Sequence, residues 1–235
     1  MSAFAIDHVV IQTPDREAFV AAVAEAAGLP ILQGYAPQGV VQSSGVRFAN
    51  GPFLDVFGAP EPGTALILGG GGVEAAERLA GDQGWRIRLV RRAERAADTP
   101  DFPWDMALFR RDQGLLTRIS VIEYADDPEA WARPDFSGGL YRPAPAGRAR
   151  LARVWLATHE VDRARADLAA FGYDVGEEVS SAFWPHGGLS LTGPASEIVL
   201  VEGPEAVVRL DIATGDDAPR ELRPAGAPAL VFDET

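Results

Sequence analysis

Apolar and polar residues alternate at the start of the chain and then change to a helical pattern. The alternation predicts a strand that carries Ile6, His8 and Val10 on one face. A helix is predicted over residues 15–27, with Thr13 as its N-cap. Three further strands follow, over residues 30–35, 40–49 and 52–57. The first unit is therefore one strand, one helix and three strands.

The same order of elements recurs along the chain. The second unit has a strand over 65–68, a helix over 73–80 and strands over 85–91, 105–110 and 115–124. The third has a strand over 151–158, a helix over 161–171 and strands over 173–179, 182–184, 189–192 and 198–202. Two more strands are predicted over 206–212 and 230–233. The recurrence predicts an α+β fold of repeated βαβββ units.

One stretch rich in proline and glycine divides this pattern into parts. We expect residues 1–128 to form a domain of two paired βαβββ units. Residues 129–149 read as a connector. Residues 150–235 are expected to form the third βαβββ unit with an incomplete C-terminal extension.

Charge and residue usage exclude several classes of function. The 235 residues carry a net charge of −13, which argues against binding to nucleic acid or to anionic membranes. Cysteine and lysine are absent, so disulfides, thiolate ligands, cysteine nucleophiles and Schiff bases are excluded. No signal peptide or membrane-spanning run is visible, which favours a cytoplasmic protein.

The repeated units, which open with D-H-V-V-I and P-D at residues 7–15, resemble the vicinal oxygen chelate superfamily of glyoxalases, bleomycin-resistance proteins and extradiol dioxygenases. The resemblance covers residues 4–125 and 150–202. It is closest to the glyoxalase-like domain branch, because R-I-S-V-I-E-Y at 118–124 precedes a proline-rich stretch. The resemblance implies paired units whose curled mixed sheets surround a metal ion, with open positions for two neighbouring substrate oxygens.

The resemblance also implies which residues bind the metal. His8 matches the first-strand ligand, and Asp55 matches a last-strand position where the family commonly has glutamate. Glu123 matches the last strand of the second unit, whereas the fourth position falls near Leu66, which cannot bind metal. One imidazole and two carboxylates on apolar strand faces suit a divalent metal such as Zn, Mn, Fe or Ni.

Each candidate ligand also has a purely structural interpretation. His8 could be a core histidine hydrogen-bonded to a carbonyl or a carboxylate. Asp55 could pair with Arg47 across the hairpin that Asn50 and Gly51 predict. Glu123 could form a salt bridge with one of three arginines: Arg86, Arg88 or Arg118. These alternatives stay open at the level of sequence.

Two functions follow from the resemblance. The first is a divalent-metal-dependent lyase or isomerase for a small substrate with adjacent oxygens, in which Glu123 is the general base. The candidate substrate-binding residues are Arg47, Trp104 and Arg118. The second is a metal-free protein that binds small molecules in the same cavity, like the drug-sequestering members of this fold. A free edge on the third unit favours a homodimer.

Two further segments have a plain and a functional interpretation. Residues 69–72 are four glycines before a helix; a loop is favoured over a phosphate cradle because lysine is absent. Residues 184–188, W-P-H-G-G, are interpreted as a turn rather than as a lid over the cavity.

Overall fold

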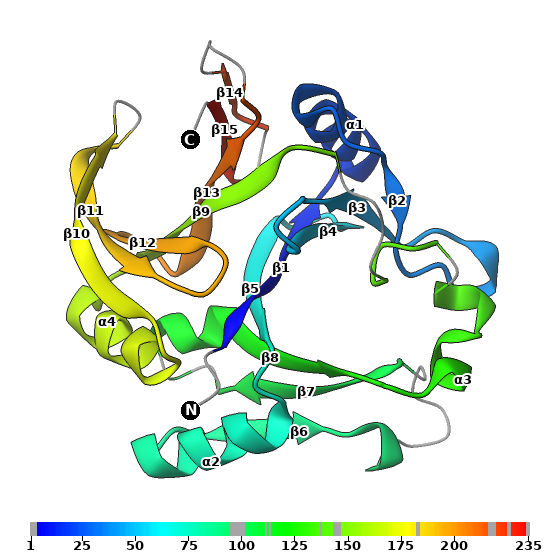
Figure 1. Ribbon diagram of the computed structural model, residues 1–235, viewed down its shortest axis with the longest axis horizontal. Coiled ribbons are helices and arrows are strands. Elements are labelled where there is room, and N and C mark those ends of the chain that lie inside the picture. Colours follow the sequence, from blue (N-terminus) through cyan, green and yellow to red (C-terminus); the bar gives the residue numbers. More distant parts are fainter. Residues whose placement is uncertain are drawn as a thin grey trace.

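Two curled sheets lie side by side in the computed structural model of the chain (Figure 1). The structure describes residues 4–94, 102–110, 112, 114–136, 138–142, 147–181, 184–215, 220–224 and 227–233. Few helices accompany many strands, so the predicted α+β class is confirmed. None of the described helices has the length and apolar character needed to cross a membrane.

The first sheet is built from two successive units. The first unit has β1 (Ala5–Thr13), α1 (Arg16–Ala27), β2 (Leu32–Gln33), η1 (Pro37–Gly39), β3 (Ser43–Arg47) and β4 (Phe53–Gly58). The second has β5 (Gly63–Gly69), α2 (Val73–Gln83), β6 (Ile87–Val90), η2 (Arg92–Glu94), β7 (Trp104–Phe109), η3 (Gly114–Arg118) and β8 (Ile119–Tyr124). The strand order is β2-β3-β4-β1-β5-β8-β7-β6, so the first strands of the two units are antiparallel neighbours at the centre.

The second sheet repeats this plan in a shorter form. Its elements are β9 (Arg150–Thr158), α4 (Val161–Ala170), β10 (Asp174–Ser181), β11 (Trp184–Thr192), β12 (Glu197–Glu202), β13 (Ala206–Ala213), β14 (Arg220–Leu222) and β15 (Ala229–Asp233). The order β10-β11-β12-β9-β13-β15-β14 puts β13, β15 and β14 in the places that β5, β8 and β7 occupy in the first sheet. The C-terminal extension is thus a reduced fourth unit, with no helix among its described residues.

The third unit therefore finds its partner strand within the same chain. β13 pairs antiparallel with β9, from Ala206 opposite Ala157 to Ala213 opposite Arg150. The free edge on which the homodimer prediction relied is covered at this point. Homodimerisation stays a prediction without that support.

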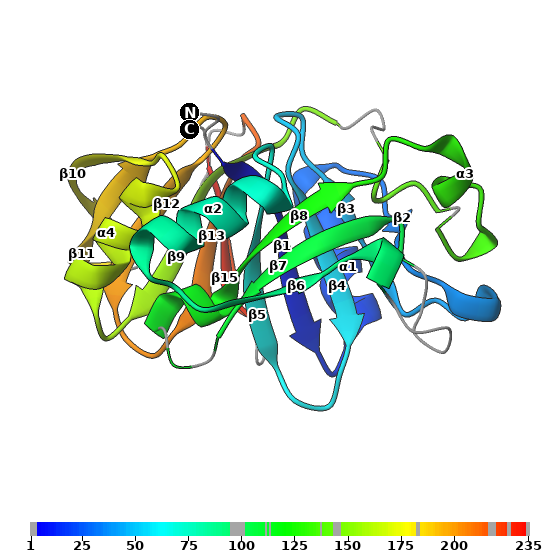
Figure 2. The same cartoon turned by 90° about the horizontal axis from the view of Figure 1, so that it is seen from below.

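The largest apolar core joins the two sheets. It combines β1, β5 and β8 residues with β9 and β13 residues, and α1, α2 and α4 pack on the outer side of their sheets (Figures 1 and 2). The rings of Phe4 and Phe171 meet edge-on with centroids 5.3 Å apart. A smaller apolar cluster occupies the inner side of the first sheet. It includes Phe53, Ile67, Trp104, Phe136, Leu140 and Tyr141.

The segment predicted as a connector contributes to this smaller cluster. It holds α3 (Pro128–Trp131) and η4 (Pro134–Phe136), which lie beside the first sheet (Figure 1). Leu140 is fully buried and Tyr141 is 9% exposed. The segment therefore covers the inner face of the first sheet as well as linking the two halves.

A bulge in β1 overturns one prediction about which residues share a face. The pairing of β1 with β5 shifts register between Ile6 and His8. As a result Ile6 packs in the large core with Val9, whereas His8 and Val10 face the inner side. An inserted residue in one strand shifts the alternation by one position, which the apolar pattern alone does not reveal.

Three local predictions also differ from the structure. Asp15, not Thr13, is the N-cap of α1, and its carboxylate accepts a hydrogen bond from the Ala18 amide at 3.1 Å. The expected strand over 115–118 is part of the 3-10 helix η3, in which Leu115 and Leu116 are both buried. The expected turn over 184–188 is part of β11; residues 182 and 183 and the side chain of His186 lie outside the described part of the chain.

Candidate functional site

The inner side of the first sheet encloses a cavity of about 150 Å³. The central strands line it with His8, Val10, Asp55, Phe57, Ile67 and Ile122. Its other walls are Tyr35, Phe102, Trp104, Met106 and Tyr141. Two polar side chains from neighbouring strands thus face a space that is otherwise mostly aromatic and aliphatic.

His8 is held in one orientation by a carboxylate. Its Nδ1 lies 2.6 Å from Asp7 Oδ1, and the hydroxyl of Tyr124 donates to the same oxygen at 2.7 Å. The imidazole also stacks on Phe53, with centroids 4.4 Å apart. Because a carboxylate only accepts hydrogen bonds, Nδ1 of His8 is the donor in this contact. The structural interpretation of His8 as a core histidine bonded to a carboxylate is therefore confirmed.

Asp55 is buried without full hydrogen bonding. Its side chain is on β4, the residue is 3% exposed, and Oδ2 accepts a hydrogen bond from the Tyr141 hydroxyl at 2.7 Å. No described residue hydrogen-bonds to Oδ1. Burial raises the pKa of Asp55, while His8 and the hydroxyls of Tyr141 and Ser43 oppose that rise. The cavity thus contains an acid whose ionised form is poorly solvated.

Arg47 does not neutralise Asp55. Its guanidinium donates to the carbonyl oxygens of Leu140 at 2.7 Å and Gly51 at 3.0 Å, and it lies 4.9 Å from the ring centre of Phe53. The structural alternative for Asp55, a pair with Arg47, is therefore wrong. Arg47 thus ties the segment over residues 129–149, which covers the inner face of the first sheet, to the β3–β4 hairpin. It is not among the residues that line the cavity.

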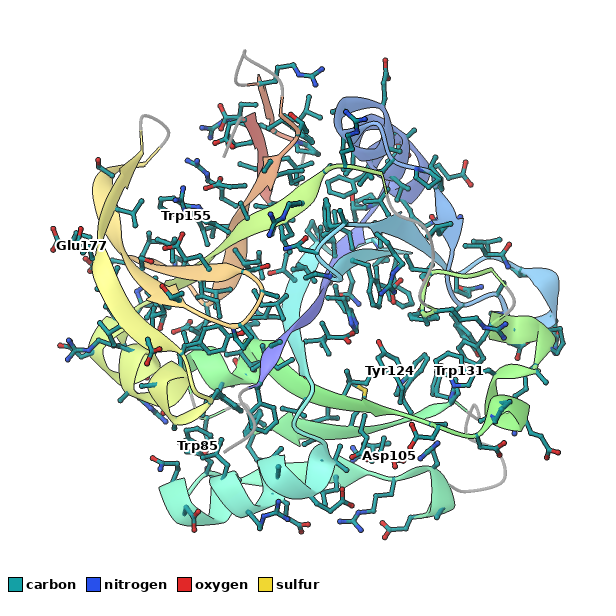
Figure 3. All side chains as sticks on the ribbon, in the orientation of Figure 1. Trp85, Asp105, Tyr124, Trp131, Trp155 and Glu177 are labelled. Carbon is teal, nitrogen blue, oxygen red and sulfur yellow. The ribbon has the colours of Figure 1, made fainter. Side chains whose placement is uncertain are left out.

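Aromatic rings build the walls opposite the central strands. Trp104 lies 5.0 Å from Phe102 and 5.1 Å from Tyr141, measured between ring centres. Tyr124 and Trp131 lie 5.7 Å apart on the inner side of the first sheet (Figure 3). Trp104 therefore lines the cavity, as its prediction as a substrate-binding residue requires. Such rings offer stacking surfaces to a planar ligand.

Glu123 lies on the other side of β8. It shares a face with Ile119 and Val121, as predicted, but that face belongs to the large core, whereas Ile122 faces the cavity. Glu123 Oε2 accepts a hydrogen bond from the Val73 amide at 2.8 Å. The carboxylate therefore caps α2 and interacts favourably with the positive end of that helix. No described arginine forms the salt bridge with Glu123 that was the structural alternative.

The predicted metal centre is consequently not assembled. His8 and Asp55 face the cavity, Glu123 faces α2, and Leu66 is fully buried in the large core. Across the residues that the structure describes, no three histidine, cysteine, aspartate or glutamate side chains gather closely enough to hold a metal ion. Two donors do not match the three-ligand set expected for Zn, Mn, Fe or Ni, so the predicted centre does not fit this site.

Two other predicted sites have a structural explanation. Arg118 donates from Nε to the carbonyl oxygen of Glu205 at 2.9 Å, so it joins the two sheets far from the cavity lining. In the glycine loop over 69–72, the N-terminus of α2 is already occupied by Glu123. A Cβ on Gly72, whose φ is +79°, would lie 2.9 Å from the Glu123 carboxylate. The plain-loop interpretation is favoured.

Three polar residues of the site were missed at the level of sequence. Asp7 and Tyr124 orient His8, and Tyr141 hydrogen-bonds Asp55. Asp7 is adjacent to His8, and a regular strand would have pointed the two side chains to opposite sides. Tyr141 lies in the proline- and glycine-rich segment, where no periodic pattern assigns a direction to its side chain.

Known structures share this fold. No family model matches the chain, and no curated protein matches it. The chain has the vicinal oxygen chelate fold, the α+β fold of the extradiol dioxygenases. A hypothetical protein from Staphylococcus aureus matches with a TM-score of 0.65 at 11% identity, covering 99% of each chain.

Two dioxygenase structures match nearly as well. Homoprotocatechuate 2,3-dioxygenase from Arthrobacter globiformis has a TM-score of 0.60 at 14% identity, covering 98% of this chain and 80% of the enzyme. A mutant of homoprotocatechuate 2,3-dioxygenase from Brevibacterium fuscum has a TM-score of 0.65 at 12% identity, covering 98% of this chain and 71% of the enzyme. At these identities the similarity establishes the fold, while function has to be argued from the site.

Proposed function

We propose that this protein binds a small organic molecule with a single ring in the cavity beside His8 and Asp55. The observation that carries the proposal is the buried Asp55 Oδ1 that lacks a hydrogen-bond partner among the described residues. A buried polar atom in this state costs about 1–3 kcal/mol of stability. Such a cost is typical of functional sites, where a ligand supplies the missing partner.

The size and lining of the cavity define the class of ligand. A cavity of about 150 Å³ is large enough for one six-membered ring, and an engineered cavity of similar volume in another protein binds benzene. Trp104, Phe102 and Tyr35 supply aromatic surface for the ring. Asp55 and His8 supply the polar atoms that would fix its orientation.

The geometry supports ligand binding better than the metal-dependent lyase or isomerase. That activity needed Glu123 as a metal ligand and general base, and Glu123 instead caps α2. The inner faces of β5 and β8 present Ile67 and Ile122 to the cavity, and neither side chain binds metal or moves a proton. Binding of an organic molecule requires only the residues that do line the cavity.

A cavity-filling variant tests this proposal. We expect Val10→Phe to fill the space beside Asp55 and to abolish binding of single-ring compounds such as phenol, benzyl alcohol and benzylamine. The matched control is Val208→Phe, which adds the same ring to the small apolar cluster around Trp155 in the second sheet. Binding is measured by two-dimensional NMR, using the indole NH signal of Trp104.

The proposal requires that at least one of these compounds bind the wild type with a stoichiometry of one and shift the Trp104 signal. The control variant should retain that binding. If none of the compounds shifts the signal, or if Val10→Phe binds them as the wild type does, this cavity is not the ligand site.

A further inference from the structure

We propose that the ligand of the cavity is a compact organic cation, a single ring bearing an ammonium or amidinium group, and that Asp55 is its counter-ion. This inference rests on the proposed ligand-binding function. It adds the charge and the hydrogen-bonding character of the ligand, neither of which follows from the size of the cavity.

The unpaired polar atom of Asp55 is a hydrogen-bond acceptor. Asp55 Oδ1 has no partner among the described residues. An ionised carboxylate only accepts hydrogen bonds, so a complementary ligand brings N–H or O–H donors rather than acceptors. An ammonium group has three donors and an amidinium has donors on both nitrogens, so either can donate to Asp55.

The charges around the cavity also favour a cation. Asp55 is a desolvated carboxyl group, and the guanidinium of Arg47 is used by the carbonyl oxygens of Leu140 and Gly51. A buried carboxylate is far less costly when a cation is paired with it, and a neutral donor does not supply that charge. An anionic ligand would be repelled by the Asp55 carboxylate.

The walls of the cavity are largely aromatic. Five aromatic residues line the cavity: Tyr35, Phe57, Phe102, Trp104 and Tyr141. Aromatic faces attract cations through the ring quadrupole, and pockets that combine several rings with an acid recognise organic ammonium groups. The net charge of −13 also raises the local concentration of cations around the protein. Walls, counter-ion and overall charge thus favour the same class of ligand.

The test compares ligands of nearly equal shape and different charge. Benzylamine is a cation at neutral pH, benzyl alcohol is a neutral donor and benzoate is an anion. Each is titrated calorimetrically into protein treated with EDTA, so that no metal ion mediates binding. We expect benzylamine to bind at least about tenfold more tightly than benzyl alcohol because its hydrogen bonds are charge-assisted. Benzoate should not bind.

Two variants locate the charge that causes the preference. Asp55→Asn keeps the shape of the side chain and removes its charge, so the preference for benzylamine should disappear while benzyl alcohol still binds. Glu123→Gln removes one negative charge outside the cavity and should leave the preference unchanged. The comparison of the three ligands in the wild type needs no variant and therefore does not depend on the folding of either one.

The outcomes separate this inference from the proposed function. Equal affinities for benzylamine and benzyl alcohol, or a preference for benzylamine that survives Asp55→Asn, would refute the proposal that the ligand is a cation paired with Asp55. The proposed binding of a single-ring molecule in the cavity would remain. Binding of benzoate in preference to benzylamine would also refute the cationic ligand, and would leave an anionic ligand in the cavity. If no ring compound binds, the proposed function falls together with this inference.

Discussion

Removing the hydroxyl of Tyr141 should show how much its hydrogen bond stabilises the buried carboxyl group of Asp55. Tyr141→Phe deletes the donor that lies 2.7 Å from Asp55 Oδ2 and 3.1 Å from Ser43 Oγ. The ring itself stays in contact with Phe53 and Trp104, at centroid distances of 5.8 and 5.1 Å. Asp55 Oδ2 then loses its hydrogen bond from Tyr141, and Oδ1 already had no partner among the described residues.

The expected loss of stability in Tyr141→Phe depends on whether Asp55, the hydrogen-bond acceptor, is charged. A hydrogen bond to a charged group contributes about 1.5–3 kcal/mol, so Tyr141→Phe should lower the free energy of unfolding by about that amount where Asp55 is ionised. With Asp55→Asn as the background the acceptor is neutral, and the same change should cost only about 0.5–1.5 kcal/mol. The two costs differ by about 1 kcal/mol, which is the coupling energy of a double-mutant cycle.

The contribution of Asp55 to folding stability changes with pH in a definite direction. Burial holds the folded-state pKa of Asp55 above its ordinary value of 3.8, so the folded protein binds this proton more tightly than the unfolded chain. The contribution of Asp55 to stability is therefore greatest below about pH 3.8 and is lost as the pH rises through the raised pKa. Tyr141→Phe removes a hydrogen bond that favours the ionised form, so its cost should shrink as the pH falls through that same range.

Urea unfolding followed by circular dichroism, from about pH 8 to about pH 4, measures these differences. Tyr173→Phe is a matched control, because Tyr173 is also buried but its hydroxyl has no hydrogen-bond partner among the described residues. That change should be neutral or slightly stabilising. A cost of Tyr141→Phe below about 0.5 kcal/mol, or an equal cost with and without Asp55→Asn, would refute the reasoning.

Two other changes test the assignments outside the cavity. Glu123→Gln should lower the free energy of unfolding by about 0.3–1 kcal/mol, the usual worth of a charge at a helix N-terminus. It should not alter the divalent metal content of protein purified without chelator; stoichiometric metal that disappears in this variant would restore the predicted centre. Arg209→Met should cost about 3–5 kcal/mol, because Asp211 would stay buried after losing its contact of 2.5 Å with Arg209 Nε. A melting temperature unchanged by that substitution would contradict the ion pair.

Alternation along single strands is the part of the site that could be predicted. Phe53, Asp55 and Phe57 were expected on one face of a strand, and the structure has them on the inner side of β4. Ile119, Val121 and Glu123 were also correctly grouped. A strand repeats every two residues whatever surrounds it, so residue order is sufficient to say which side chains share a side.

The choice between the two sides of each strand required the whole fold. An apolar strand face can pack against helices in a core or against aromatic rings around a cavity, and both environments select the same residue types. The grouping of Glu123 with Ile119 and Val121 therefore did not show that this face meets α2. Register irregularities act similarly, since the bulge before His8 reverses the side on which Ile6 packs.

Residue order by itself determined the succession of βαβββ units, the α+β class and two polar residues, His8 and Asp55, that interrupt apolar strands. Tertiary structure decided that these two share a cavity, that Glu123 does not, and that Tyr141 from a distant loop hydrogen-bonds Asp55. The physical reason is the distance along the chain between the residues that determine each feature. Secondary structure and facing depend on neighbours within a few residues, whereas a site depends on which faces of distant strands become buried against each other.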